Sequence, residues 1–158
     1  MDVIKKIPTL HIEQFEQGIT DDFYSNDFDN HLAQNNNIIH KPHKHDFFLC
    51  MLFTSGSGIH EIDFNTYPIE RGSVFMLKPG QTHHWRFDKS PRGYIFFHTK
   101  DFYEQYFLNK GISQFPFYFT QENPPHLLVN DKYLDKLVSL FKEITMEYRV
   151  TIYINSKS

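Results

Sequence analysis

The sequence predicts a mainly β domain, a barrel or a sandwich of short strands, followed by helices. Two observations predict this class. Between residues 38 and 98, short apolar segments alternate with turn signals, and no helical period intervenes. After residue 98, the apolar residues take the spacing of amphipathic helices. A chain of 158 residues is long enough for one domain with its own buried core.

At least six short strands are expected in the β region, in a sandwich or barrel rather than a βαβ fold. The segment 46–53, DFFLCMLF, is apolar on both faces and is expected to be a central, fully covered strand. Further strands are expected at 59–64, 73–77, 83–87 and 94–98. Turns or loops are expected at 54–58, 78–81 and 88–93, where Gly, Pro, Ser or Asn gather, and a tight connection is expected within 65–72.

Residues 1–37 are expected to form an N-terminal arm with at most one early strand. Acidic clusters and a run of three asparagines at 35–37 interrupt any apolar period. A flexible leader is the alternative interpretation. An arm rich in Phe and Asp could also close over the barrel.

Two helices are expected after the β region. In the first, 100–111, Asp101 and Glu104 have the spacing of a capping box, and Gly111 suits the C-terminal stop. The segment 115–119, FPFYF, is expected to be extended. The second helix, 130–148, has the clearer helical spacing of apolar residues.

The helix 130–148 can begin at Asn130 or Asp131, since either side chain can cap it. Its apolar residues have the 3-4 spacing of a coiled-coil seam. The seam consists of Leu134, Leu137, Val138, Phe141, Ile144 and Tyr148. It extends over only about two heptads, fewer than the three to four of a sustained coiled coil. A homodimer through this seam is the favoured prediction, and a helix packed on its own barrel is the alternative.

Charge and cysteine content exclude several classes of function. The net charge of −3 gives no reason to expect nucleic-acid binding. Cys50 is the single cysteine, so an internal disulfide is impossible. The N-terminus has no apolar block of signal-peptide length, and no stretch is apolar enough to cross a membrane. We therefore expect a cytoplasmic protein without a membrane partner.

Histidines are concentrated around the first strand. His43 and His45 are two residues apart, so in a strand they share one face. His83, which follows a Pro-Gly turn, could join them as a third metal ligand. His40 and His84 are expected at the surface. The alternative for the first three is a set of hydrogen-bonded core histidines, or a solvated strand end for His43.

The carboxylate that usually completes such a metal site is missing from this face. Continuing from His45, the same face carries Phe47, Leu49 and Met51. The nearby acid, Asp46, is on the opposite face. The floor of the site is therefore predicted to be apolar, and neither a catalytic residue nor a cofactor is predicted.

Three motifs, HKHDFF, TSGSGIHEIDFNTYPI and KPGQTHHW, occur in order between about His43 and Phe102. Together they resemble a cupin, specifically the N-terminal ligand-sensing domain of AraC-family transcription regulators. The resemblance implies a jelly-roll barrel over residues 38–120 and a helical dimerisation segment over 121–158. Metal-binding cupins carry an acid where this chain has Leu49 or Cys50, which argues against metal catalysis.

Regulators of this family contact DNA through two helix-turn-helix units that follow the barrel. No residues after Tyr148 provide such units, so the chain is expected to be either an excised sensing domain or a stand-alone relative. Any contact with DNA is expected only through that missing domain.

The favoured function is that of a non-enzymatic module that binds a small-molecule effector inside the barrel. His45 and His83 would orient the effector, and Trp85 would stack on it. The full set of predicted pocket residues is His45, Phe47, Leu49, Met51, Phe75, Leu77, His83, Trp85 and Phe97. The 17 Phe and 9 Tyr suit such a pocket and equally an aromatic core.

Two other functions stay open. The first is a small metal-dependent cupin enzyme, an isomerase or a dioxygenase, in which His43, His45 and His83 hold the metal. The second is a structural dimerisation domain whose barrel is filled and takes no effector.

Overall fold

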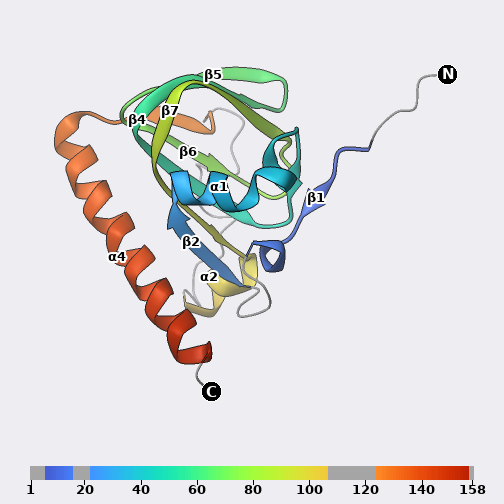
Figure 1. The fold of residues 1–158 in the computed structure, drawn as a ribbon, viewed down its shortest axis with the longest axis vertical. Helices are drawn as coiled ribbons and strands as arrows, with labels where there is room; N and C mark the ends of the chain where they lie inside the picture. The colour runs from blue at the N-terminus through green and yellow to red at the C-terminus, as the bar shows by residue number, and fades with distance from the viewer. Residues whose placement is uncertain (1–5, 16–21, 107–123, 157–158) are drawn as a thin grey trace.

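A curved antiparallel sheet, with one long helix along its outer side, makes up most of the computed structural model (Figure 1). The structure describes residues 6–15, 22–106 and 124–156. The strands are β1 (Thr9–Leu10), β2 (Phe23–Asp27), β3 (Lys44–His45), β4 (Phe48–Ile62), β5 (Asn65–Ile69), β6 (Ser73–Leu77), β7 (His83–His98) and β8 (His126–Leu128). The helices are the 3-10 helix η1 (Ile12–Gln14), α1 (Phe28–Ile39), α2 (Lys100–Tyr106) and α4 (Asp131–Ser156).

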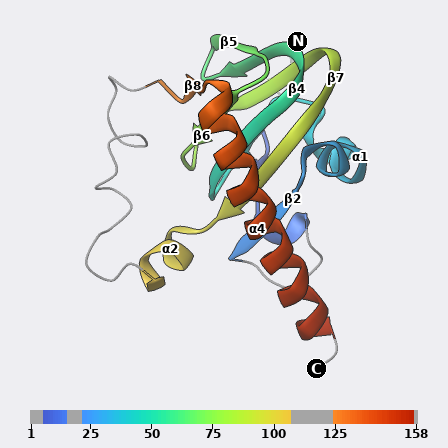
Figure 2. The same cartoon turned by 90° about the vertical axis from the view of Figure 1, so that its left-hand side faces the viewer.

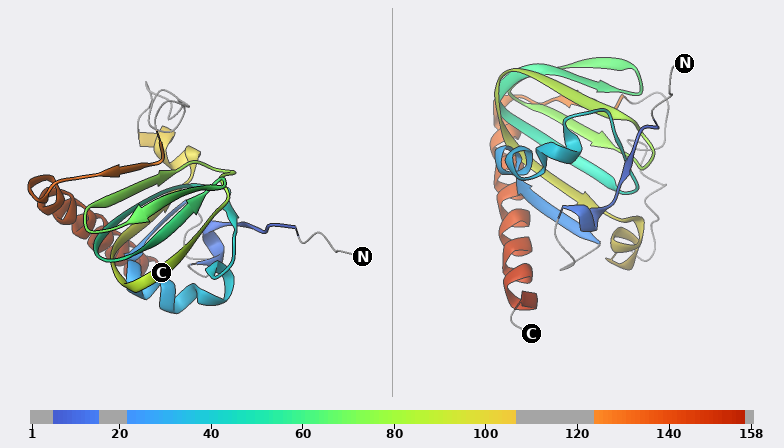
Figure 3. Two further views of the ribbon diagram at one scale, coloured as in Figure 1. Left: turned by 90° about the horizontal axis from the view of Figure 1, so that it is seen from above. Right: turned by 45° about the vertical axis from the view of Figure 1, so that its right-hand side comes forward.

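Two long strands, β4 and β7, form the centre of the sheet and pair antiparallel along most of their lengths. The strand order is β2-β7-β4-β6-β8, and β5 pairs with the second half of β4. Seen from above, the strands curl around a common interior (Figure 3). The predicted mainly β barrel, followed by C-terminal helices, is confirmed.

The turn expected at 54–58 and the loop expected at 88–93 are both wrong, because these residues lie within β4 and β7. The register between the two strands shifts here, as at a β-bulge. A Cβ atom on Gly58 would lie 2.1 Å from the carbonyl oxygen of Arg86. The glycine therefore allows two strands to approach closely at a bend, rather than reversing the chain.

The arm expected up to residue 37, with room for one early strand, contains β1 and β2 and most of the helix α1, and the second strand and the helix are corrections. The helix buries one face, formed by Phe28, His31, Asn35 and Ile39. These four residues have the 3-4-4 spacing of a helical face. Because two of them are polar, the apolar period was hidden in the sequence.

The first C-terminal helix, α2, begins where it was expected, although its cap differs. The hydroxyl oxygen of Thr99 accepts a hydrogen bond from the backbone N–H of Phe102, at 3.0 Å. Thr99, not the expected Asp101 with Glu104, is therefore the capping residue. Gly111 and the segment 115–119 lie outside the described residues.

The long helix α4 lies across the outer side of the sheet (Figure 2). Asn130 caps it, as predicted, by accepting a hydrogen bond from the N–H of Tyr133 at 3.1 Å. The helix continues to Ser156, beyond the predicted end at Tyr148. Within the described ranges, no helix combines the length and the apolar character that a membrane span requires.

Alternate residues of β4 supply two separate cores. The inner core fills the barrel and includes Phe47, Leu49, Met51 and Phe53. The outer core lies between the sheet and α4, and it consists of Cys50, Leu52, Val74, Leu134 and Phe141. The sequence expectation that residues 46–53 are covered on both faces is confirmed.

Candidate histidine site inside the barrel

Backbone hydrogen bonds bring the predicted histidines together. The N–H of His43 donates to the carbonyl of His83 at 3.1 Å, and the reverse bond measures 2.9 Å. His45 follows in β3, which pairs with β1 of the N-terminal segment. The start of β7 and the strand before β4 therefore present their histidines side by side.

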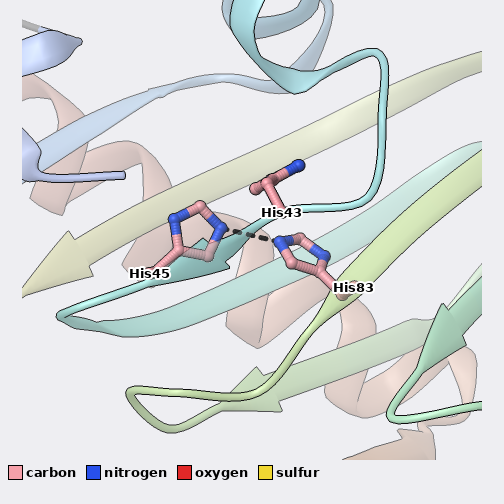
Figure 4. Close-up of side chains that lie close together, drawn as sticks. All are labelled: His43, His45 and His83. Carbon is pink, nitrogen blue, oxygen red and sulfur yellow. Dashed lines mark hydrogen bonds between the residues drawn. The ribbon is translucent and has the colours of Figure 1, made fainter. Parts of the chain in front are cut away.

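The three rings converge inside the barrel (Figure 4). His43, His45 and His83 are all buried, and their candidate ligand atoms lie within 4.8 Å of one another. The Nε2 atoms of His45 and His83 are 2.6 Å apart. The sequence prediction that these histidines share one site thus agrees with the geometry.

Local hydrogen bonds leave nitrogen atoms of this group without partners. The Nδ1–H of His43 donates to the carbonyl of Lys41, at 2.7 Å. Its Nε2 atom is buried and has no hydrogen-bond partner, and the same holds for Nδ1 of His45. An imidazole held through one nitrogen, with the other nitrogen free, is the arrangement that metal-binding histidines adopt.

A fourth buried histidine, His60, was missed by the sequence analysis. Its Nε2 atom lies 2.8 Å from Nδ1 of His83, while its own Nδ1 is buried without a partner. A signal was available, since His60 alternates in phase with the apolar Ile62 along the same strand.

A fifth histidine, His31 of α1, was also missed. Its Nδ1 atom lies 2.9 Å from the hydroxyl of Tyr24, to which Asn26 also donates, at 3.0 Å. This small polar network closes the side of the inner core below α1. Nothing in the polar sequence of that helix identified His31 as a core residue.

Burial keeps these histidines neutral at pH 7. Burial lowers the pKa of His45 and His83 well below the ordinary value, and the neighbouring histidines lower both further. Burial is also the largest influence on His43, whose pKa is lowered. It lowers the pKa of His31 and of His60 to about 3. Neutral imidazoles offer lone pairs to a metal or to a hydrogen-bond donor.

The other predicted pocket residues surround the histidines. All six apolar ones belong to the inner core, namely Phe47, Leu49, Met51, Phe75, Leu77 and Phe97. The ring of Phe47 lies 4.5 Å from that of His45, and Trp85 packs at 5.0 Å from the ring of His83. Whether these nine residues bind a ligand stays a prediction.

The N-terminal segment supplies a side chain that the sequence analysis did not identify. Phe15, just after η1, lies 5.0 Å from the ring of Phe97 and 6.3 Å from that of His45. This segment lies on the side of the barrel opposite α4 (Figures 1 and 3). Phe15 therefore covers the histidine site from that side.

The site contains no acidic side chain among the residues that the structure describes. Leu49 belongs to the inner core. Asp46 faces away, as predicted, and its carboxylate pairs with the exposed His11 at 2.5 Å. The donor set is therefore three imidazoles, which fit a divalent transition metal in ligand type and protonation state.

One surface pocket of about 190 Å³ reaches the edge of this site. His83 and His84 line it, together with Pro42 and Phe64. His40 is exposed and His84 is half-exposed. The pocket borders His83 from the surface, while the side chain of His83 is itself buried.

The residues of the predicted dimer seam divide into two groups. Leu134, Phe141 and Tyr148 are buried against the chain's own sheet. Leu137, Val138 and Ile144 stay half-exposed. The packing of the first group matches the alternative of an intramolecular helix, and a role of the second group in dimerisation remains a prediction.

A jelly-roll barrel with a histidine site inside and a helix after it defines a cupin-like ligand-binding domain. The model of one family, described as "AraC-like ligand binding domain", matches residues 26–145. The chain therefore belongs to the AraC-like ligand-binding domain family, as its motifs indicated.

Solved structures match parts of the chain at low scores. The plu4264 protein of Photorhabdus luminescens is 15% identical at a TM-score of 0.36, over 44% of this chain and 61% of that one. A cupin protein of Bacteroides fragilis is 19% identical at a TM-score of 0.31, over 37% and 51%. The matches thus span about half of those proteins. No curated protein is significantly similar to the chain.

Proposed function

We propose that the chain is the effector-sensing domain of an AraC-type transcription regulator, with its effector bound at the histidine site. The observation that carries this proposal is the set of unpartnered nitrogens, on His43, His45 and His60, inside an aromatic core. Each unsatisfied buried polar group costs about 1–3 kcal/mol. Unpaired buried groups of this kind are typical of sites where a ligand can form hydrogen bonds or metal bonds with them.

The chemistry of the lining restricts the effector. Imidazole nitrogens can donate to or accept from hydroxyl, carbonyl or carboxyl groups of a ligand. Trp85 and Phe97 offer flat apolar faces for stacking. A small molecule with one polar edge and one apolar face fits both features.

The N-terminal segment is in a position to respond to the effector. Leu10 of β1 pairs with His45 of β3, and Phe15 contacts the ring of Phe97. A ligand that reaches His45 from this side must move Phe15. Such a ligand shifts the position of the segment only if it prefers one arrangement over the other.

Dimerisation would use the part of α4 that the sheet leaves exposed. Tyr133, Leu137, Leu140 and Ile144 are exposed or half-exposed and have a 4-3-4 spacing along one stripe. A second copy could pack on this stripe, while the buried face of α4 keeps its contacts with the barrel. Contact with DNA would require a helix-turn-helix domain outside these residues.

The dimer proposal is tested by the mass in solution. Leu137→Asp with Leu140→Asp should convert a dimer to a monomer that keeps its β circular dichroism. Light scattering coupled to size exclusion would measure the mass. An unchanged dimer mass in the folded variant would contradict the stripe as the contact.

The effector proposal is tested by thermal stability. The chain is screened against neutral sugars, small carboxylic acids and phenolic compounds. A compound at 100 times its Kd should add about 2.7 kcal/mol to the free energy of unfolding. That addition raises Tm by several degrees.

A matched pair of variants distinguishes binding at the buried histidine site from binding at the adjacent surface. His83→Ala should abolish the rise in Tm, and His84→Ala, the next residue on the same strand, should retain it. Equal responses of the two variants, or no response of the wild type to any compound, would contradict the effector site.

A second candidate is a small metal-dependent cupin enzyme, favoured by the convergence of three neutral imidazoles. His43, His45 and His83 would hold the metal. A bound divalent ion would supply a Lewis acid that polarises an oxygen of the substrate. The inner core around the site would exclude water, and the backbone bonds between His43 and His83 would fix the ligand spacing.

The metal candidate is tested by titration of the chelator-treated chain with Zn²⁺, Co²⁺ or Ni²⁺. One ion per chain, lost in His45→Ala, would support it. Binding at the same strength in His45→Ala would place the ion elsewhere and contradict the three-histidine site.

A further inference from the structure

We propose that His60 is a positioning residue that sets the tautomer of His83. The cation site would then consist of three histidine ligands and a fourth histidine that supports one of them. This inference rests on the metal-binding candidate above. It concerns a residue that lies outside the group of three ligands, near the end of β4.

Two hydrogen bonds join three rings in a row. Nε2 of His45 lies 2.6 Å from Nε2 of His83, and Nδ1 of His83 lies 2.8 Å from Nε2 of His60. All three side chains are buried. The outer nitrogens of the row, Nδ1 of His45 and Nδ1 of His60, have no partners.

The proton count of this row allows two arrangements. Three neutral imidazoles carry three N–H groups, and two of these occupy the two hydrogen bonds. The row can therefore run from His45 through His83 to His60, each ring donating to the next. It can equally run in the opposite direction, with His60 as the first donor.

A bound cation would fix the direction of the hydrogen bond between Nδ1 of His83 and Nε2 of His60. Both His45 and His83 must then turn an Nε2 lone pair toward the ion, so His83 carries its proton on Nδ1. That Nδ1–H donates to Nε2 of His60, and His60 consequently carries its own proton on Nδ1. His60 is thus the acceptor that holds His83 in its metal-binding tautomer.

Packing alone does not require a histidine at this position. The ring of His60 lies 4.4 Å from that of Phe75 and 5.5 Å from that of Trp85, in apolar surroundings. An apolar side chain would fill the same space without an unpartnered nitrogen. The acceptor toward His83 is what the imidazole adds.

The test compares two substitutions at this position. His60→Gln keeps an acceptor oxygen near the place of Nε2, and His60→Leu removes it at similar volume. Calorimetric titration with Zn²⁺ should show binding about 10–100-fold weaker in His60→Leu, the usual loss when an outer-shell partner is removed. His60→Gln should bind close to wild type.

A second measurement uses the wild-type chain and does not depend on the folding of a variant. Nitrogen-15 NMR of the imidazoles should show His60 protonated at Nδ1, and not at Nε2, once Zn²⁺ is bound. His60 protonated at Nε2 in the Zn²⁺-bound chain would overturn the proposal.

Failure of the metal site and failure of the His60 role would give different experimental results. Absence of Zn²⁺ binding in the wild type would overturn the metal candidate and this inference together. Zn²⁺ binding of wild-type strength in a folded His60→Leu would overturn this inference alone. Weaker binding in His60→Leu, rescued in His60→Gln, supports both.

Discussion

The inner and outer cores are built from alternate residues of the same strand, yet they differ in chemistry. The outer core, beneath α4, consists of apolar side chains and the thiol of Cys50, and the buried hydroxyls of Ser25 and Thr145 beside it satisfy each other at 2.8 Å. Burial raises the pKa of that thiol to about 12, so it stays protonated. The inner core adjoins five buried histidines, three of which have a nitrogen without a partner.

This difference separates stability from binding. An apolar core gains free energy from each buried group. A cluster of unpaired imidazoles costs free energy, and it gives a ligand groups to satisfy. We therefore expect substitutions in the outer core to change stability, and substitutions in the histidine site to change mainly binding.

The largest effect is expected from Phe141→Ala in the outer core. Phe141 is buried on α4 and contacts the rings of Tyr94 and Phe96. Its loss should lower the free energy of unfolding by about 3–5 kcal/mol, measured by urea denaturation. Met146→Ala, at a 66% exposed position of the same helix, should change it by less than about 0.5 kcal/mol.

Protein concentration provides the control for this comparison. Because Phe141 packs on its own sheet, the loss should be the same at low and high concentration. A loss that appears only where the chain is dimeric would place Phe141 in the dimer contact instead.

Acid should lower the free energy of unfolding because buried His31 gains a proton when the chain unfolds. The pKa of His31 is about 3 in the folded chain and near 6.5 when unfolded, so the unfolded chain binds more protons between these values. His31 alone therefore lowers the free energy of unfolding by about 1.4 kcal/mol per pH unit below pH 6.5, in addition to the fall caused by the other buried histidines. His31→Asn should remove the contribution of His31 to the change of unfolding free energy with pH, measured by urea denaturation at several pH values between 7.5 and 5. Identical slopes in both proteins would contradict it.

A smaller change in stability is expected from His45→Leu. The substitution removes one hydrogen bond and one unpartnered nitrogen at similar volume. The free energy of unfolding should change by no more than about 1 kcal/mol, while binding of an effector or a metal is lost. A loss of stability as large as that of Phe141→Ala would show instead that the histidine site is structural.

The smallest effect is expected at the exposed edge of the N-terminal segment. The hydrogen bond that His11 donates to the Asp46 carboxylate raises the pKa of His11, so the pair stabilises the fold below pH 6.5 and loses that effect as the pH rises through the raised value. Exposed pairs contribute about 0.2–1 kcal/mol. Asp46→Asn should therefore lower stability at pH 6 and leave it nearly unchanged at pH 8.5. Equal losses at the two pH values would contradict the pairing.

The sequence predicted the parts of the site that follow a simple period. Alternation along β4 placed Phe47, Leu49 and Met51 on the histidine face and Asp46 on the other. His60 lies out of phase with these residues, because the register of β4 shifts between Phe53 and Gly58, so alternation from His45 does not place it on the histidine face. His31 was hidden because the buried face of α1 is half polar, and Phe15 reaches the site only through the tertiary fold.

The central claim is that the histidine end of the inner core exists to bind a ligand. Native mass spectrometry of the wild type and His45→Leu, each incubated with the compound panel and with Zn²⁺, tests it most directly. The account predicts one small molecule or one ion per wild-type chain and none on the variant. A bare mass for the wild type under every condition, or equal uptake by both proteins, would contradict it.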